Sequence, residues 1–162
     1  MNPEQPIYLI RHGEYDEAAG EDGGLTDVGR EQAHEAAGHL REAGVVPGTL
    51  TLLTSSAPRT AETAGIIGDE LDATPLPSER LYDNGQFSYQ VMDLDGLFEQ
   101  VLTEHGLTMT DVESMAVVNH APLMGLVKGL ATGNIGFPRH GEVVEYTPGS
   151  WVPLEQWPKP RR

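Results

Sequence analysis

Three short segments carry the residues best suited to chemistry: Arg11-His12-Gly13, Arg59 and Asn119-His120. Each falls where a predicted strand or turn gives way to a helix or loop, and ligands of open α/β sheets bind just beyond the carboxyl ends of strands. Arginine forks bind phosphate oxygens through two parallel hydrogen bonds, and a histidine that is neutral at a ring nitrogen can attack phosphorus. These residue types therefore indicate phosphoryl transfer at one edge of a sheet.

The scaffold must bring three distant segments to that edge. Short apolar runs alternate with amphipathic stretches, which predicts βα units and an α/β fold: a single domain, residues 1–162, with a mainly parallel sheet flanked by helices. We expect a frayed tail over 156–162. We expect helices over 26–44, 58–71, 93–105 and 122–132, and strands over 7–10, 50–53, 115–118 and within 74–91, with a C-terminal β-hairpin formed by 142–146 and 150–154.

The composition of the chain limits which binding partners and which cellular compartment we expect. Acidic residues outnumber basic ones by 25 to 10, which gives the 162-residue chain a formal charge of −15. Nucleic acids and anionic membranes need a broad basic face, so we expect neither as a partner. The absence of cysteine excludes thiolate nucleophiles and cysteine-held metals. With neither a membrane-length apolar run nor a signal peptide in the sequence, we expect a soluble, cytoplasmic protein.

Four segments follow one another in a recognisable order. They are residues 9–14 (LIRHGE), 25–29 (LTDVG), 54–64 (TSSAPRTAETA) and 119–125 (NHAPLMG). Together they resemble the histidine phosphatase superfamily, which includes phosphoglycerate mutases and acid phosphatases. The resemblance spans residues 7 to about 127. The short chain and its segment 81–83 are most similar to the small bacterial phosphohistidine phosphatases of the SixA type.

The resemblance implies a phosphoglycerate mutase-like fold and a set of site roles. His12 would be the nucleophile that becomes phosphorylated, and nearby arginines would keep it neutral by lowering its pKa. Arg11, Arg59 and a protonated His120 would bind the transferring group, whose charge spreads over three oxygens. Gly13 would let the backbone approach the substrate. We expect no metal and no cofactor.

Three questions about the site are left open by the sequence. The proton for the leaving group could come from Asp83, from Glu79 or from no dedicated acid. Asp83 is favoured because it precedes a predicted turn that could bring it to the rim, although it could equally be an aspartate that only caps that turn. Asn119 stands where the family usually has Gly or Ser, and could bind substrate or simply narrow the pocket. His140 lies in a loop that could border the site.

We therefore expect a metal-independent phosphatase that acts through a phosphohistidine on His12. A mutase would need a lid and more cations to shield the phosphoenzyme from water. Bonds between phosphorus and a histidine nitrogen have an easily protonated leaving group, which favours a phosphohistidine-containing protein over a small phosphorylated metabolite. A small-molecule phosphomonoesterase is the alternative within the family. A catalytically silent phosphate- or phosphoprotein-binding regulator is the alternative from another class.

Overall fold

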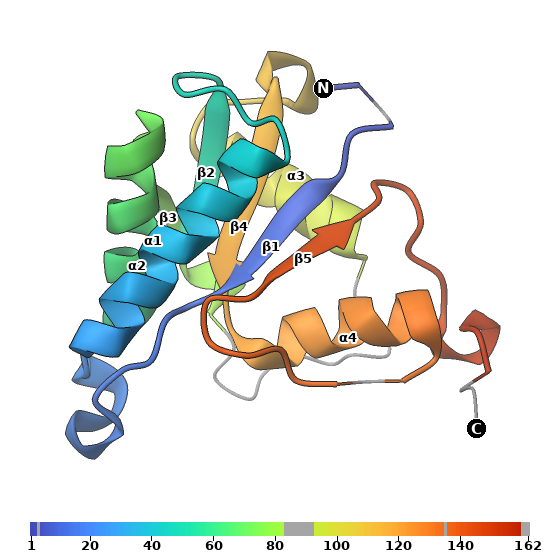
Figure 1. Cartoon of the computed structure of the whole chain (residues 1–162). Coiled ribbons are helices and arrows are strands. Elements are labelled where there is room, and N and C mark those ends of the chain that lie inside the picture. Colours follow the sequence, from blue (N-terminus) through green and yellow to red (C-terminus); the bar gives the residue numbers. More distant parts are fainter. Residues whose placement is uncertain (3, 83–92, 135, 160–162) are drawn as a thin grey trace.

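The computed structural model describes residues 1–2, 4–82, 93–134 and 136–159, which form a five-stranded sheet flanked by helices. The strand order is β3-β2-β4-β1-β5 (Figure 1). The parallel strands are β1 (Ile7–Arg11), β2 (Leu50–Ser55), β3 (Leu76–Ser78) and β4 (Ser114–Asn119), and β5 (Val143–Tyr146) runs antiparallel to β1. The predicted α/β class with a mainly parallel sheet is confirmed.

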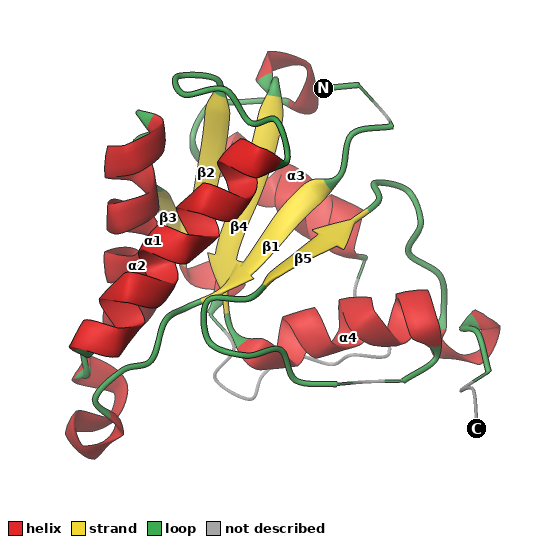
Figure 2. Cartoon of the chain, in the orientation of Figure 1, coloured by secondary structure: helices red, strands yellow, loops and turns green. Residues whose placement is uncertain are grey.

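Two pairs of helices cover the two faces of the sheet (Figure 2). Helices α1 (Asp27–Glu42) and α2 (Pro58–Leu71) pack on one face, and α3 (Leu94–Glu104) and α4 (Ala121–Thr132) pack on the other. Short 3-10 turns lie at Glu17–Asp22 (η1), Glu79–Leu81 (η2), Met109–Asp111 (η3) and Leu154–Gln156 (η4). No helix of the described residues is long and apolar enough to cross a bilayer.

The central strands bury side chains on both faces, which explains their unbroken apolar sequence. Leu9 and Val117 belong to the core under α3 and α4, whereas Ile10 and Val118 belong to the core under α1 and α2. By the same alternation, the polar residues that end β1 and β4 lie on the α3 and α4 side. The two cores thus fix which way the last residue of each strand faces.

Only the first strand of the expected C-terminal hairpin forms. Residues 150–153 follow a turn closed by the Ser150 amide and the Thr147 carbonyl, but they pair with no strand. Pro153 has no N–H to donate to a ladder, and the segment is instead held by side chains. Trp157 packs edge-on against Trp151, with ring centroids 6.1 Å apart, and its Nε1 donates to the Val152 carbonyl at 3.1 Å.

Candidate active site

The candidate site lies at the carboxyl ends of β1, β2 and β4. Strand β4 lies between β1 and β2, so the strand order reverses there, which is where open α/β sheets bind ligands. Arg11 ends β1 and is in register with Asn119, which ends β4, and His120 is the N-cap of α4. Arg59 is the second residue of α2. The structure thus brings together the segments that the sequence singled out.

His12 is buried at this edge, with 4% of its surface exposed. Its Nδ1 lies 2.8 Å from the Gly13 carbonyl oxygen, so Nδ1 carries the proton and donates it to that acceptor. The lone pair is therefore on Nε2. Burial lowers the pKa of His12 to about 3, and the charges of His120, Arg59 and Arg11 act in the same direction. His12 is consequently a neutral imidazole with its basic nitrogen at Nε2.

His120 faces His12 across the site, with ring centroids 5.4 Å apart. The Nε2 of His120 lies 2.8 Å from the Ser55 hydroxyl, which in turn lies 2.6 Å from the Thr60 hydroxyl. The Nδ1 of His120 is 3.4 Å from Nη2 of Arg59. The hydroxyls of β2 and α2 therefore fix one ring nitrogen and leave the other beside a guanidinium.

Arg11 and Arg59 make this edge strongly cationic. Nη1 of Arg11 donates to the Pro138 carbonyl at 2.7 Å, whereas the Nε atoms of both arginines are buried without a hydrogen-bond partner among the described residues. Neither arginine forms an ion pair with a described carboxylate. The N-termini of α2 and α4 add their own positive potential. The arrangement is suited to a compact anion with several oxygens.

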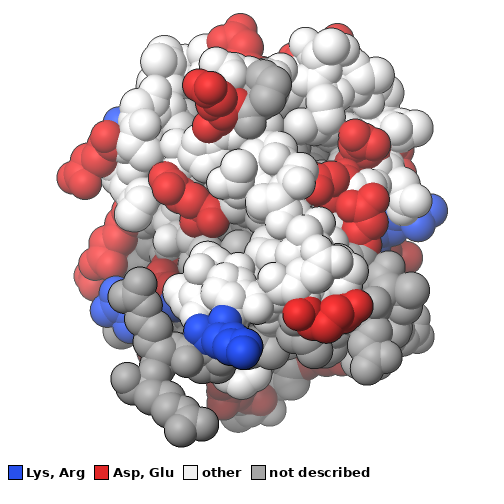
Figure 3. All heavy atoms as spheres, turned by 90° about the vertical axis from the view of Figure 1, so that its right-hand side faces the viewer, with Lys and Arg blue, Asp and Glu red and all other residues white. Residues whose placement is uncertain are grey.

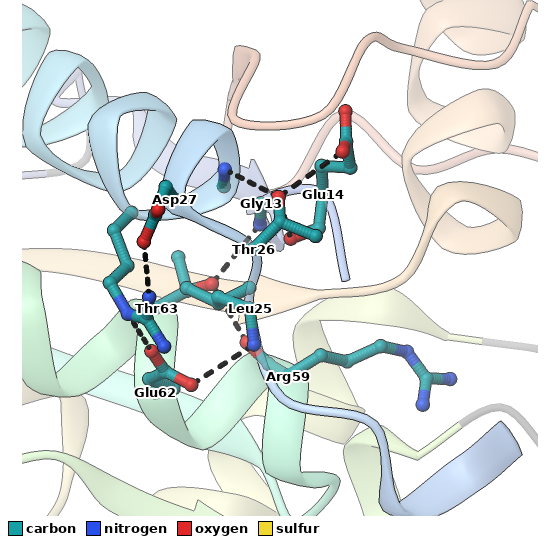
Figure 4. Close-up of polar contacts among 10 residues, drawn as sticks. Gly13, Glu14, Leu25, Thr26, Asp27, Arg59, Glu62 and Thr63 are labelled. Carbon is teal, nitrogen blue, oxygen red and sulfur yellow. Dashed lines mark hydrogen bonds and ion pairs between the residues drawn. The ribbon is translucent and has the colours of Figure 1, made fainter. Parts of the chain in front are cut away.

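Gly13, the residue after His12, lies where the loop after β1 meets α1 and α2 (Figure 4). The Gly13 amide donates to the Thr63 hydroxyl at 3.1 Å, and that hydroxyl donates to the Arg59 carbonyl at 2.8 Å. In Figure 4 the Arg59 side chain extends away from this network. A Cβ on Gly13 would overlap the backbone of Gly29 in α1. Glycine at residue 13 is therefore required by packing.

The segment before α1 forms hydrogen bonds with the loop after β1 and with α2. The Thr26 hydroxyl accepts from the Gly29 amide and donates to the Glu14 carboxylate, each at 3.1 Å. Glu62 of α2 accepts from the Leu25 amide at 3.0 Å (Figure 4). These contacts give a structural role to the motif over residues 25–29, which holds none of the candidate catalytic residues.

His140 belongs to the wall of the site. Its ring centroid lies 5.4 Å from that of His12, and its Nδ1 lies 3.3 Å from the His12 carbonyl oxygen. Burial, followed by the charge of Arg11, lowers the pKa of His140. Its loop is fixed by Glu142, which pairs with Lys128 of α4 at 2.5 Å. The sequence suggested only that this loop could border the site.

Four further side chains at the site escaped sequence reasoning. Ser55 and Thr60 lie within the motif over residues 54–64, so the resemblance could have pointed to them. Tyr82 follows η2 and lies within the segment 81–83 that resembles SixA-type phosphatases, although no role was expected for its ring. Tyr15 directly follows the first motif and belongs to no pattern that could have been used. Their rings contact the two histidines and Arg59.

The other candidate residues from the sequence differ in where the structure places them. Asp83 lies outside the described residues. Glu79 is exposed in η2, and no described hydrogen bond or ion pair joins its carboxylate to His12. Asn119 is 0% exposed, and neither its Oδ1 nor its Nδ2 has a hydrogen-bond partner among the described residues. Across those same residues, no three His, Asp or Glu side chains gather in a way that could hold a metal ion.

Comparison with known proteins assigns the class. The model of the histidine phosphatase superfamily (branch 1) matches residues 7–119, and the chain belongs to this superfamily. The protein is accordingly a phosphatase. No curated protein sequence matches it.

Solved structures of phosphatases share the fold. The protein histidine phosphatase SixA in complex with tungstate is 18% identical, with a TM-score of 0.60 over 88% of this chain and 94% of that chain. A mycobacterial glucosyl-3-phosphoglycerate phosphatase in complex with VO3 is 17% identical, with a TM-score of 0.60 over 87% and 90%. A putative phosphohistidine phosphatase SixA from Nakamurella multipartitia is 26% identical, with a TM-score of 0.52 over 77% and 65%.

Proposed function

We propose that the protein hydrolyses phosphohistidine in a protein substrate, and that it does so through a phosphohistidine on its own His12. One observation carries the proposal: a buried histidine, held neutral with its lone pair on Nε2, lies beside arginines that no described carboxylate neutralises. A nucleophile needs that lone pair, and a phosphoryl group needs those donors.

In the first step, Nε2 of His12 attacks phosphorus in line with the substrate's P–N bond. A bond forms between Nε2 and phosphorus while the P–N bond breaks, and its electron pair stays on the leaving imidazole, which takes up a proton. Arg11, Arg59 and a protonated His120 donate to the three equatorial oxygens. In the free protein Nη2 of Arg59 donates to Nδ1 of His120, because a guanidinium has no acceptor. Protonation of His120 replaces this hydrogen bond: Nε2–H is accepted by Ser55, and Nδ1–H and Arg59 both become donors to the phosphoryl group.

In the second step, water attacks the phosphorylated His12. A P–O bond forms as the bond to Nε2 breaks, the electron pair returns to Nε2, and the water's proton leaves with inorganic phosphate or to solvent. The neutral imidazole is restored because burial and the neighbouring cations oppose its protonation.

The proposed substrate class follows from how readily the leaving group takes up a proton. A departing imidazole is easily protonated, so it needs no strong acid, unlike the alkoxide of a phosphate ester. Two structural relatives whose names assign them to phosphohistidine phosphatases also support this choice.

A small phosphate ester is the second candidate. A phosphatase named for a glucosyl phosphoglycerate shares the fold at the same TM-score as SixA.

Phosphate release from a phosphohistidine-bearing protein and from a panel of phosphate esters tests the proposal. We expect selective release from phosphohistidine, a loss of at least about 10³-fold in His12→Ala, and little change in Asp83→Ala. His39→Ala, an exposed histidine of α1, is the matched control. During turnover, label from the substrate should be trapped on the wild-type chain in an acid-labile, alkali-stable form.

Other outcomes would contradict the proposal. Turnover of esters that collapses in both His12→Ala and Asp83→Ala would identify a small-molecule phosphatase with Asp83 as its acid. Binding of inorganic phosphate without turnover of any substrate, and with binding preserved in His12→Ala, would instead identify a silent binding module.

A further inference from the structure

Two tyrosines from distant parts of the chain flank the Arg59 guanidinium. Its Cζ lies 4.7 Å from the centroid of the Tyr15 ring and 6.0 Å from that of the Tyr82 ring. Both distances fall within the range in which a ring face attracts a cation. Both tyrosines are half-buried, so solvent only partly screens the attraction.

The same two rings contact the two histidines of the site. Tyr15 meets His12 edge to face, with centroids 5.3 Å apart and planes at 82°. Tyr82 meets His120 with centroids 5.2 Å apart and planes at 72°. Tyr15 also meets His140, with centroids 6.5 Å apart. Each ring therefore contacts Arg59 and at least one histidine, and the position of Arg59 is tied to those of His12 and His120.

Each tyrosine is held by its own backbone. Tyr15 forms an isolated antiparallel bridge with Leu25, which leads into α1. Tyr82 caps η2, and its amide donates to the Glu79 carbonyl at 3.0 Å. The two rings therefore come from separate backbone segments, each with its own hydrogen bonds.

Arg59 is held differently from the other helix arginines. Arg30 pairs with Glu62, and Arg41 pairs with Glu70. No carboxylate of the described residues pairs with Arg59, and its Nε is buried without a hydrogen-bond partner among them. A carboxylate would occupy the donors and neutralise the charge, whereas an aromatic face attracts the charge without occupying an in-plane N–H group. Nη2 of Arg59 donates to His120, and the other N–H groups form no hydrogen bond with a described carboxylate.

We propose that Tyr15 and Tyr82 are positioning residues that clamp Arg59 through their ring faces, so that its charge and its N–H donors stay available to the phosphoryl group. The proposal rests on the proposed function, because it assigns the clamp to the arginine that would bind the transferring group. Pre-orientation of a long side chain removes part of the entropy that substrate binding would otherwise have to offset.

The test compares Leu and Phe at each position. Leucine removes the ring face, and phenylalanine keeps it while removing the hydroxyl. Affinity for tungstate, measured by calorimetry, should fall by about tenfold in Tyr15→Leu and by less in Tyr82→Leu, whose ring is farther from Cζ. For phosphate release, the loss should fall mainly on kcat, since correctly placed donors match the three equatorial oxygens of the transition state better than the oxygens of the bound substrate. Tyr15→Phe and Tyr82→Phe should recover most of both losses.

A double-mutant cycle with Arg59→Ala distinguishes a clamp from general support of the fold. If the rings act through Arg59, Tyr15→Leu should cause almost no further loss of tungstate affinity in the Arg59→Ala background. Equal losses in both backgrounds would overturn the proposal, as would a folded Tyr15→Leu with unchanged tungstate affinity and kcat. A wild type that binds tungstate but hydrolyses nothing would refute the proposed function, while the tungstate cycle would still decide whether the clamp exists.

Discussion

His12 couples the chemistry of the site to the stability of the fold. Its pKa is about 3 in the folded chain, against an ordinary value of 6.5. As the pH falls below 6.5, His12 takes up a proton in the unfolded chain but not in the folded chain. The folded state therefore loses stability until the pH reaches about 3.

We expect this loss to disappear in His12→Asn. The wild-type free energy of unfolding should drop, relative to that of the variant, by on the order of 1 kcal/mol for each pH unit below the ordinary histidine pKa. Urea denaturation at pH 7 and pH 5, in buffers free of phosphate, measures the difference. Parallel pH profiles for the two proteins would mean that His12 titrates normally.

The buried amide of Asn119 lowers the stability of the free protein, and we expect a bound phosphate to offset that loss. Its amide is fully buried with both polar atoms unpartnered among the described residues, beside Arg11 on the next strand. An unsatisfied buried amide is destabilising, whereas an apolar side chain of similar size at the same place is not. We expect Asn119→Leu to raise the free energy of unfolding by about 1 kcal/mol and to weaken phosphate binding severalfold. A variant that is less stable yet binds phosphate normally would show that the amide serves packing alone.

At the scale of elements, the loop that follows His12 crosses α1 so closely that Gly29 has no room for a side chain. A Cβ on Gly29 would overlap the backbone of Glu14, and neither backbone can move without disturbing His12. We expect Gly29→Ala to lower the free energy of unfolding by about 1–3 kcal/mol.

Gly38 in the same helix is the matched control for this prediction. A Cβ there meets nothing within 4 Å, so Gly38→Ala should stabilise the protein by up to about 1 kcal/mol through helix propensity. Thermal or urea unfolding of the two variants gives opposite signs if the contact is as tight as described, and the same sign if α1 can shift away.

The sheet and the motif residues could be predicted because each had a local signature. The buried strands are continuous apolar runs, and the arginines and histidines follow them directly. The missing second strand of the C-terminal hairpin could not be predicted from its turn, because the outcome depends on Trp151 and Trp157 packing together. Tyr15 and His140 reach the site through a bridge and a loop whose courses are set by tertiary contacts.

At the scale of the molecule, the cationic site is set in an acidic body. The formal charge is −15, and acidic side chains are spread over the face shown in Figure 3, where basic ones are few. Repulsion from the whole molecule acts over many ångströms and is screened by salt, whereas contacts with Arg11 and Arg59 act at a range shorter than the screening length.

We expect kcat/KM for a small dianionic phosphate ester that the protein turns over to rise about two- to threefold as ionic strength increases from about 10 to 150 mM. A basic phosphohistidine peptide should show the opposite trend, because the acidic body attracts it. Steady-state rates for both substrates at several NaCl concentrations measure the two slopes. A fall for both substrates would mean that the local cations dominate the approach as well as the binding.

The packing of Trp151 on Trp157 also has an optical consequence. These are the two tryptophans of the chain, so fluorescence excited at long ultraviolet wavelengths originates in the segment that follows β5. Separation of the two indoles would change that emission, while circular dichroism follows the helices and the sheet. Recording both signals during heating would reveal whether the C-terminal segment detaches before the rest of the protein melts.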